Sequence, residues 1–209
     1  MFSVVVSQRQ AGKNGRRDAS FDFGTNPCSE IILRPYQFCN LSEVVVRAED
    51  TLDTLRTKVR SAAILGTLQA TLTDFRYLRK IWKDNTEEEA LLGVSLTGIM
   101  DHPVMSGRKS RAELQEWLTE LKKEAIKTNR TWAVRLGINV STAITAVKPS
   151  GTVSQLVDSA SGIHPRYAEQ YVRRVRADAR DPFCPVLAAS VLPGQTAVTS
   201  PTTTVLPVT

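Results

Sequence analysis

Residues 24–46 read GTNPCSEIILRPYQFCNLSEVVV and carry most of the information about fold and chemistry. Cys28 lies in a proline-containing turn, two residues before the carboxylate of Glu30. Proline fixes its own φ and keeps the preceding Asn26 extended, so the turn can hold Cys28 at a loop tip. Cys39 follows eleven positions after Cys28, at the start of a β-rich run. The stretch therefore combines two thiols with an acid/base group.

Five segments of the chain are predicted to be strands. Residues 31–33 and 38–46 are rich in β-branched and aromatic side chains, with a turn between them. Residues 91–99 and 140–147 are short apolar runs, typical of strands buried on both faces. Residues 171–176 form the fifth predicted strand.

Helices alternate with these strands. Asp50 is expected to cap a helix that continues towards Leu72, with the apolar residues Leu52, Leu55, Val59, Ala62 and Ala63 at helical spacing. Ser110 and Glu113 form a capping-box pattern for a helix reaching about Leu136. Further helices are predicted from Val153 and over residues 182–189, and residues 75–84 stay unassigned. This alternation predicts the α/β class with a parallel sheet, but spacing alone does not separate an open sheet from a barrel.

The predicted organisation has three parts. Residues 1–23 are a lead-in loop, residues 24–189 the part with the predicted strands and helices, and residues 190–209 a disordered tail rich in Ser, Thr and Pro. No 18-residue apolar run or signal-peptide pattern occurs, so we expect no membrane span. Three cysteines do not make a secreted disulfide framework, which favours reduced thiols and a cytoplasmic location.

The chain is basic, with a net charge of +6 from 27 Lys and Arg against 21 Asp and Glu. Its basic residues are scattered, aromatic residues make up 6% of the chain, and no zinc-finger or helix-turn-helix spacing occurs. We therefore do not expect nucleic-acid binding, and a polyphosphate substrate fits the charge equally well. Two histidines without clustered cysteines indicate no protein-bound metal.

Four motifs resemble those of one known family, the adenosylcobalamin-dependent (class II) ribonucleotide reductases, in particular the monomeric ribonucleoside triphosphate reductases. In chain order they are GTNPCSEI (24–31), FCNLSEV (38–44), KPSGTVSQL (148–156) and SASGIHPRYAEQYVRRVR (159–176). The resemblance implies a ten-stranded α/β barrel of two halves with a finger loop through its centre. This chain then corresponds to the finger-loop tip and the second, C-terminal half of the barrel, which is incomplete on its own.

The resemblance also implies roles for four residues. Cys28 is the thiyl radical site that exchanges a hydrogen atom with the ribose, and Glu30 is the general base on the 3′-hydroxyl. Asn26 binds the sugar hydroxyls. Cys39 is one thiol of the pair that becomes a disulfide as the 2′-hydroxyl leaves as water. A buried inert thiol, a solvated glutamate and a turn-forming asparagine are the structural alternatives for these residue types.

A phosphate site is predicted at Pro149, Ser150, Gly151 and Thr152. A buried strand that ends in a Gly-containing turn and opens a helix presents unpaired backbone N–H groups to an anion. An ordinary helix cap is the alternative. Cys184 is expected to pack in a helix, and His164 has no assigned role.

The resemblance implies adenosylcobalamin as cofactor, although no residue of this chain is identifiable as its contact. It also implies a ribonucleoside triphosphate substrate, an external dithiol reductant such as thioredoxin, and a missing N-terminal half-barrel with the first reducing cysteine. The isolated chain is expected to be inactive. The alternative is an inactive nucleotide-binding remnant or assembly module of a split reductase, and the absence of a glycine-radical loop pattern disfavours a glycyl radical enzyme.

Overall fold

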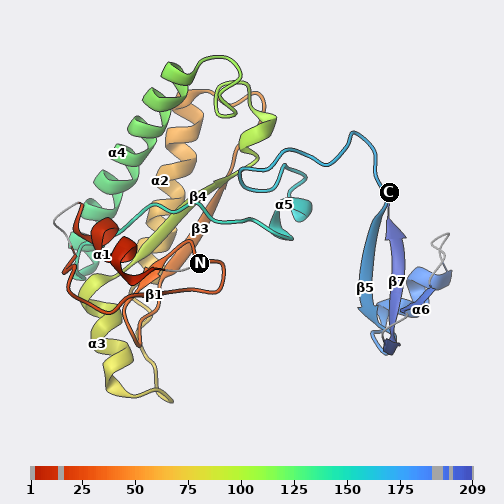
Figure 1. Cartoon of the computed structure of the whole chain (residues 1–209), viewed down its shortest axis with the longest axis horizontal. Helices are drawn as coiled ribbons and strands as arrows, with labels where there is room; N and C mark the ends of the chain where they lie inside the picture. Colours follow the sequence, from red (N-terminus) through yellow and green to blue (C-terminus); the bar gives the residue numbers. More distant parts are fainter. Residues whose placement is uncertain (1–2, 14–16, 190–194, 198–199, 209) are drawn as a thin grey trace. The chain divides into compact units, whose positions relative to one another are not determined.

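The structure is a computed structural model that describes residues 3–13, 17–189, 195–197 and 200–208. It divides into two compact units, residues 1–165 and 166–209. Figure 1 labels the elements of both, and each unit is described by itself. The larger unit contains the hairpin, the parallel strands and the long helices that position the candidate site.

A short hairpin carries the first cysteine. Strand β1 (Gly24–Thr25) pairs antiparallel with β2 (Ile32–Leu33). The connecting turn includes Ser29 in the left-handed region, at φ 63°. The strand predicted at residues 31–33 is thus confirmed, and Cys28 lies in the turn as expected.

Two parallel strands form the centre of the unit. Strand β3 (Asn40–Val45) pairs with β4 (Leu92–Thr97) in a register from Asn40 opposite Leu92 to Val45 opposite Thr97. Parallel neighbours need a long crossover, which α2 (Leu52–Gln69) and α3 (Lys80–Glu89) supply. The α/β class and the predicted parallel pairing are confirmed.

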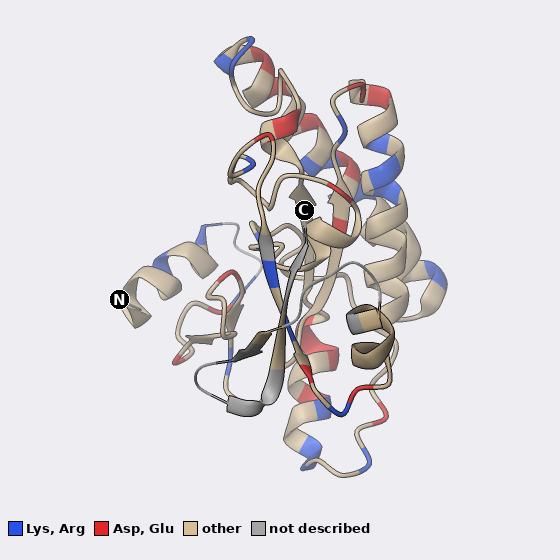
Figure 2. Ribbon diagram, turned by 90° about the vertical axis from the view of Figure 1, so that its right-hand side faces the viewer, with Lys and Arg blue, Asp and Glu red and all other residues tan. Residues whose placement is uncertain are grey.

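Helices α2 and α4 (Arg111–Leu136) lie side by side and cover one face of the strands (Figure 1). Both basic and acidic residues occur along the helices (Figure 2). Alternate residues of β3 and β4 point towards the helices. The core between them consists of aliphatic side chains, among them Val44, Val46, Leu55, Val59, Leu92, Val94, Leu121 and Ala125.

Asp50 does not cap α2 as predicted. Thr51 is the N-cap and forms a capping box with Thr54, whereas Asp50 accepts bonds from the Arg47 backbone N–H and from Lys58. In α4 the predicted cap is present, because the Ser110 side chain accepts from the Glu113 N–H. Residues 75–84, left unassigned from sequence, include the start of α3.

The strand predicted at residues 140–147 is largely absent. This segment lies along β4 through an isolated parallel bridge between Val94 and Thr145 and backbone bonds from Leu92 and Val94 to Ala143 and Ile144. The described residues of this unit thus contain one two-stranded parallel sheet with a third segment beside it. The half-barrel inferred from the resemblance is not confirmed by this arrangement.

Glycine is required where β4 ends. Gly98 has φ 77°, and a side chain there would meet the carbonyl oxygen of Val46. The chain then forms η1 (Ile99–Asp101). Thr97 and Asp101 bind the backbone of Ala160, which fixes the returning segment against the end of β4.

Both ends of the chain differ from the predicted loop and tail. Helix α1 (Val4–Gly12) lies within the expected lead-in loop. In the smaller unit β5 (Arg173–Asp178) pairs antiparallel with β7 (Ser200–Val208), which also pairs with β6 (Gln195–Ala197). Residues 195–197 and 200–208 of the expected disordered tail are therefore strands, and the rest of residues 190–209 lies outside the described part of the chain.

The predictions for residues 171–176 and 182–189 agree with β5 and α6 (Phe183–Ala189). Among the described residues, no helix is long and apolar enough to cross a membrane.

Candidate functional site

The hairpin turn is held by Asn26. Its side-chain carbonyl accepts from the Ile31 N–H at 3.0 Å, and its backbone carbonyl accepts from the Ser29 N–H at 2.9 Å. The turn-forming alternative for Asn26 is therefore seen in the structure. Its amide nitrogen is the group left for a substrate hydroxyl.

The two cysteines of the opening stretch differ in exposure. Cys28 is exposed at the hairpin turn, and Cys39 is partly buried just before β3. Both are free thiols. A radical on an exposed sulfur would react with solvent and oxygen, so the role expected of Cys28 would require a covering surface that the described residues do not form over it.

Glu30 is brought towards Cys39. Burial raises the pKa of the Cys39 thiol above its usual 9.0, and the negative charge of Glu30 raises it further. Both carboxylate oxygens of Glu30 are buried and have no hydrogen-bond partner among the described residues. Burial of a carboxylate without a hydrogen-bond partner costs free energy. Glu30 is therefore a candidate to bind a group that the described residues do not include.

A second carboxylate, Glu43, was missed by the sequence reasoning. Ser150 donates its hydroxyl to Glu43 Oε2 at 3.2 Å, and Oε1 of Glu43 is buried without a partner in the described residues. Side chains four residues apart on an extended segment point to the same face, so the spacing of Cys39 and Glu43 predicts that they share one face. That periodicity was the signal available in FCNLSEV.

The predicted phosphate turn is only partly formed. Helix α5 (Val153–Leu156) has four residues, which is too short for the dipole effect expected of it. Gly151 has φ 58°, and Thr152 precedes the helix without a side-chain cap. Ser150 is buried against Glu43, so its hydroxyl becomes available to a phosphate only if that bond opens.

A recess of about 720 Å³ adjoins Glu30. Its walls are mostly aliphatic side chains from β4, α4 and residues 145–147, and its charged groups are Glu30 and Lys122. The recess therefore places one carboxylate in an apolar setting. It offers no dense set of polar groups such as a large amide-rich cofactor would require, so the described residues do not define an adenosylcobalamin site.

The remaining sequence candidates are Cys184 in the smaller unit and His164 in the larger one. Cys184 is buried in α6 and donates to the Asp178 carbonyl at 3.1 Å, which agrees with the packing role expected of it. His164 is exposed. Among the described residues, no group of three or more His, Cys, Asp or Glu side chains could hold a metal ion.

Similarity to known proteins supports the family that the four motifs indicate. No family model matches the chain. The adenosylcobalamin-dependent ribonucleoside-triphosphate reductase of Lactobacillus acidophilus is 31% identical over 187 residues, covering 78% of this chain and 25% of the relative. The protein of the same name from Lacticaseibacillus paracasei is 30% identical over 202 residues, covering 85% of this chain and 26% of the relative.

A solved structure shares the fold. The crystal structure of a B12-dependent (class II) ribonucleotide reductase superposes with a TM-score of 0.69 at 24% identity, covering 88% of this chain and 28% of that chain. The α/β fold is thus that of part of a ribonucleotide reductase.

Fold and sequence together define the chain as a ribonucleotide reductase relative. More narrowly, it belongs with the adenosylcobalamin-dependent ribonucleoside-triphosphate reductases, as the four motifs indicated. It spans about a quarter of the length of the curated relatives it matches, at 25% and 26% of the two proteins named above.

Proposed function

We propose that this chain is a catalytic portion of an adenosylcobalamin-dependent ribonucleoside triphosphate reductase, which replaces the 2′-hydroxyl of the ribose by hydrogen. The observation that carries the proposal is the buried carboxylate of Glu30, which follows Cys28 by two residues, has no hydrogen-bond partner among the described residues and raises the pKa of the Cys39 thiol. Thiols and a carboxylate are the groups this reduction needs, and Glu30 and its neighbour Ser29 line the recess.

Each residue has one task in the proposed reaction. The Cys28 sulfur radical takes the 3′-hydrogen atom of the ribose while Glu30 takes the proton of the 3′-hydroxyl. The 2′-hydroxyl leaves as water with a proton from a thiol pair that includes Cys39. The second thiol hydrogen of the pair goes to C2′, so the pair supplies two electrons and becomes a disulfide. Glu30 returns its proton to the 3′-oxygen, and Cys28 returns its hydrogen atom to C3′.

Substrate binding is assigned to two further places. The amide of Asn26 binds the sugar hydroxyls, and the turn Pro149, Ser150, Gly151 and Thr152 binds the phosphates. The bond from Ser150 to Glu43 must then exchange for a bond to phosphate, because an anion beside the Glu43 carboxylate is repelled.

The proposal requires another polypeptide region. Within the described part of the chain β3 pairs with β4 alone, and a groove of about 620 Å³ lies along β3 beside α2. An unpaired strand edge is a template for another strand. We therefore assign residues 24–189 to the second half of the barrel, completed by an N-terminal half that covers Cys28 and supplies the second thiol of the pair.

Adenosylcobalamin would supply the initial radical when bound, and its contacts are not identifiable among the described residues of this chain. An external dithiol such as thioredoxin returns electrons to the thiol pair, and a cytoplasmic location is consistent with such a reductant. The alternative, an inactive nucleotide-binding module of a split reductase, keeps the phosphate turn without turnover.

Reconstitution tests the proposal. The chain is co-expressed with the N-terminal portion of the Lactobacillus acidophilus reductase and assayed for deoxyribonucleotide formation with adenosylcobalamin and a dithiol. We expect turnover that Cys28→Ala reduces to background and that the packing control Cys184→Ala retains. Turnover in Cys28→Ala removes this thiol from the mechanism, and absence of turnover in the assembled wild type favours the inactive module.

A further inference from the structure

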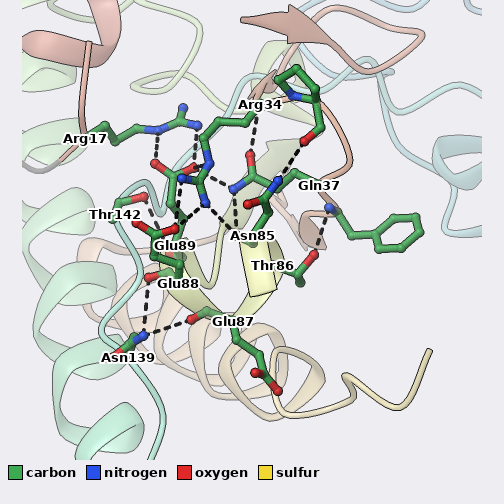
Figure 3. Close-up of polar contacts among 12 residues, drawn as sticks. Arg17, Arg34, Gln37, Asn85, Thr86, Glu87, Glu88, Glu89, Asn139 and Thr142 are labelled. Carbon is green, nitrogen blue, oxygen red and sulfur yellow. Dashed lines mark hydrogen bonds and ion pairs between the residues drawn. The ribbon is translucent and has the colours of Figure 1, made fainter. Parts of the chain in front are cut away.

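The hairpin that carries Cys28 and Glu30 has few contacts of its own, since β1 and β2 contribute two residues each. A two-residue ladder is too short to hold a fixed position in water. Its placement must come from the segments on either side of it. Both segments lead to one buried carboxylate, Glu89, at the end of α3 (Figure 3).

Arg17 holds the segment before the hairpin. Its guanidinium makes two bonds to Glu89, at 2.9 Å and 2.8 Å, and a third to the Ile32 carbonyl of β2 at 2.9 Å. The side chains of Arg17 and Glu89 are 6% and 5% exposed. A paired, planar contact of this kind fixes direction as well as distance.

Arg34 and Gln37 hold the segment after the hairpin. Arg34 binds Glu88 and the Asn85 carbonyl, each at 3.0 Å, and lies 3.5 Å from Glu89. Gln37 donates to Glu89 at 2.6 Å and its side-chain oxygen accepts from the Arg34 N–H. Glu89 is therefore bound from both sides of the hairpin.

Aromatic rings complete the arrangement. Arg17 lies over the ring of Phe23 at 4.8 Å, and Arg34 lies over the ring of Phe21 at 4.5 Å. Cation–π contacts of this kind gain strength when the charges are removed from water. The two rings precede β1 directly and so extend the anchorage to the first strand of the hairpin.

We propose that Arg17, Arg34 and Glu89 form a clamp that positions the hairpin, so that Glu30 stands beside Cys39. They are positioning residues, since none of them lies in the recess. The importance of this clamp for turnover rests on the proposed function. The effect of the clamp on the hairpin does not rest on the proposed function, because the position of Glu30 can be measured without substrate.

The measurement uses the charge of Glu30 as a reporter. Because Glu30 raises the pKa of the Cys39 thiol, the pH profile of Cys39 alkylation records how close the carboxylate is. Peptide mass spectrometry separates Cys39 from the exposed Cys28 and from Cys184. Wild type, Glu30→Gln, Glu89→Gln and the double variant are compared on the intact chain.

We expect Glu30→Gln to move the Cys39 profile to lower pH in the wild-type background and to have no further effect in Glu89→Gln. Such non-additivity would show that Glu89 acts by positioning Glu30. In Glu89→Gln the clamp is open and Glu30 is already away from Cys39, so removal of the Glu30 charge has no further effect. In Glu89→Gln itself, Cys39 alkylation at pH 8 should be faster by about tenfold for each unit by which the thiol pKa falls.

The matched control is Glu124→Gln, which removes the ion pair of Arg60 with Glu124 between α2 and α4, at 2.7 Å. It should leave the Cys39 profile and the effect of Glu30→Gln unchanged. Circular dichroism checks the fold of each variant. If Glu89→Gln does not fold, the conservative Arg34→Lys, which keeps the charge without the fork, is used in its place.

An undiminished effect of Glu30→Gln in the folded clamp variant overturns the proposal, because Glu30 is then positioned without Glu89. Such a result would leave the proposed reductase chemistry untouched. Conversely, a reconstituted enzyme without turnover would not alter the thiol titration.

Discussion

At the residue scale, the informative feature is the difference between two buried carboxylates, Glu30 and Glu43. Glu43 has a partner in Ser150, whereas Glu30 has none among the described residues. Burial without compensation costs free energy, and it persists where the rest of the fold enforces it. The role proposed for Glu30 as the general base rests on this difference.

The first prediction concerns the pair of Glu30 and Cys39. Glu30→Gln removes the charge that opposes the thiolate, so the pKa of Cys39 should fall while burial still keeps it above its usual 9.0. Titration of Cys39 by pH-dependent alkylation measures the change. Glu43→Gln, which keeps a side chain of the same length on β3, is the control and should leave the Cys39 titration unchanged. An unchanged Cys39 profile in Glu30→Gln would contradict the prediction, because the charge of Glu30 would then have no effect on the Cys39 thiol.

At the residue scale, the candidate residues could be chosen from the sequence, but the contacts around them could not. Cys28 lies in the hairpin turn and Cys39 just before β3, and the charge of Glu30 acts on the Cys39 thiol, while the roles of these residues stay predictions. Glu43 was missed because its partner Ser150 is 107 positions away. Long-range contacts of this kind depend on tertiary packing, which local spacing does not contain.

At the element scale, long and strongly patterned segments were predicted correctly. The apolar stripes of α2 and α4 and the buried run of β4 agree with the sequence. The segment 140–147 failed, because its apolar pattern fits a buried strand while the structure gives it a single bridge to β4. The tail failed for another reason: its composition resembles disorder, but β7 pairs with β5.

A second prediction belongs to the turn after β4. Gly98→Ala should destabilise the fold by at least about 2 kcal/mol, because the left-handed backbone is strained and the new methyl group meets the Val46 carbonyl. Gly137→Ala is the matched control, since Gly137 has φ 68° and open space around it. It should cost only about 1 kcal/mol.

Urea unfolding followed by circular dichroism compares the two variants. Equal losses of stability would mean that backbone conformation alone accounts for the cost at Gly98. A larger loss for Gly98→Ala would show that the close approach of β3 to the end of β4 contributes.

At the scale of the whole molecule, stability depends on charged side chains that are far apart in the sequence and come into contact in the folded chain. Burial opposes ionisation of Glu89, but hydrogen bonds from Arg17 and Gln37 and the charges of Arg17 and Arg34 outweigh it and lower its pKa below the usual 4.5. A carboxyl whose pKa is lower in the folded state stabilises the fold above its unfolded pKa. That contribution disappears as the pH falls through the folded value.

The third prediction follows from this linkage. The free energy of unfolding should decrease from pH 5 downwards, and Glu89→Gln should be less stable at pH 7 by roughly 1–3 kcal/mol with a shallower acid dependence. Urea titrations at pH 7, 5, 4 and 3 provide the comparison. Glu116→Gln, an exposed position on α4, should follow the wild type, and parallel curves for wild type and Glu89→Gln would contradict the prediction.

The position of Arg17 has a practical consequence for anyone trimming the gene. A shortened version starting at Gly24 would still encode both thiols, both carboxylates and every motif shared with the relatives, and on inspection would look complete. It would nevertheless lack one of the two arginines that grip Glu89. Boundaries drawn around recognisable motifs would thus discard part of the support on which those motifs depend.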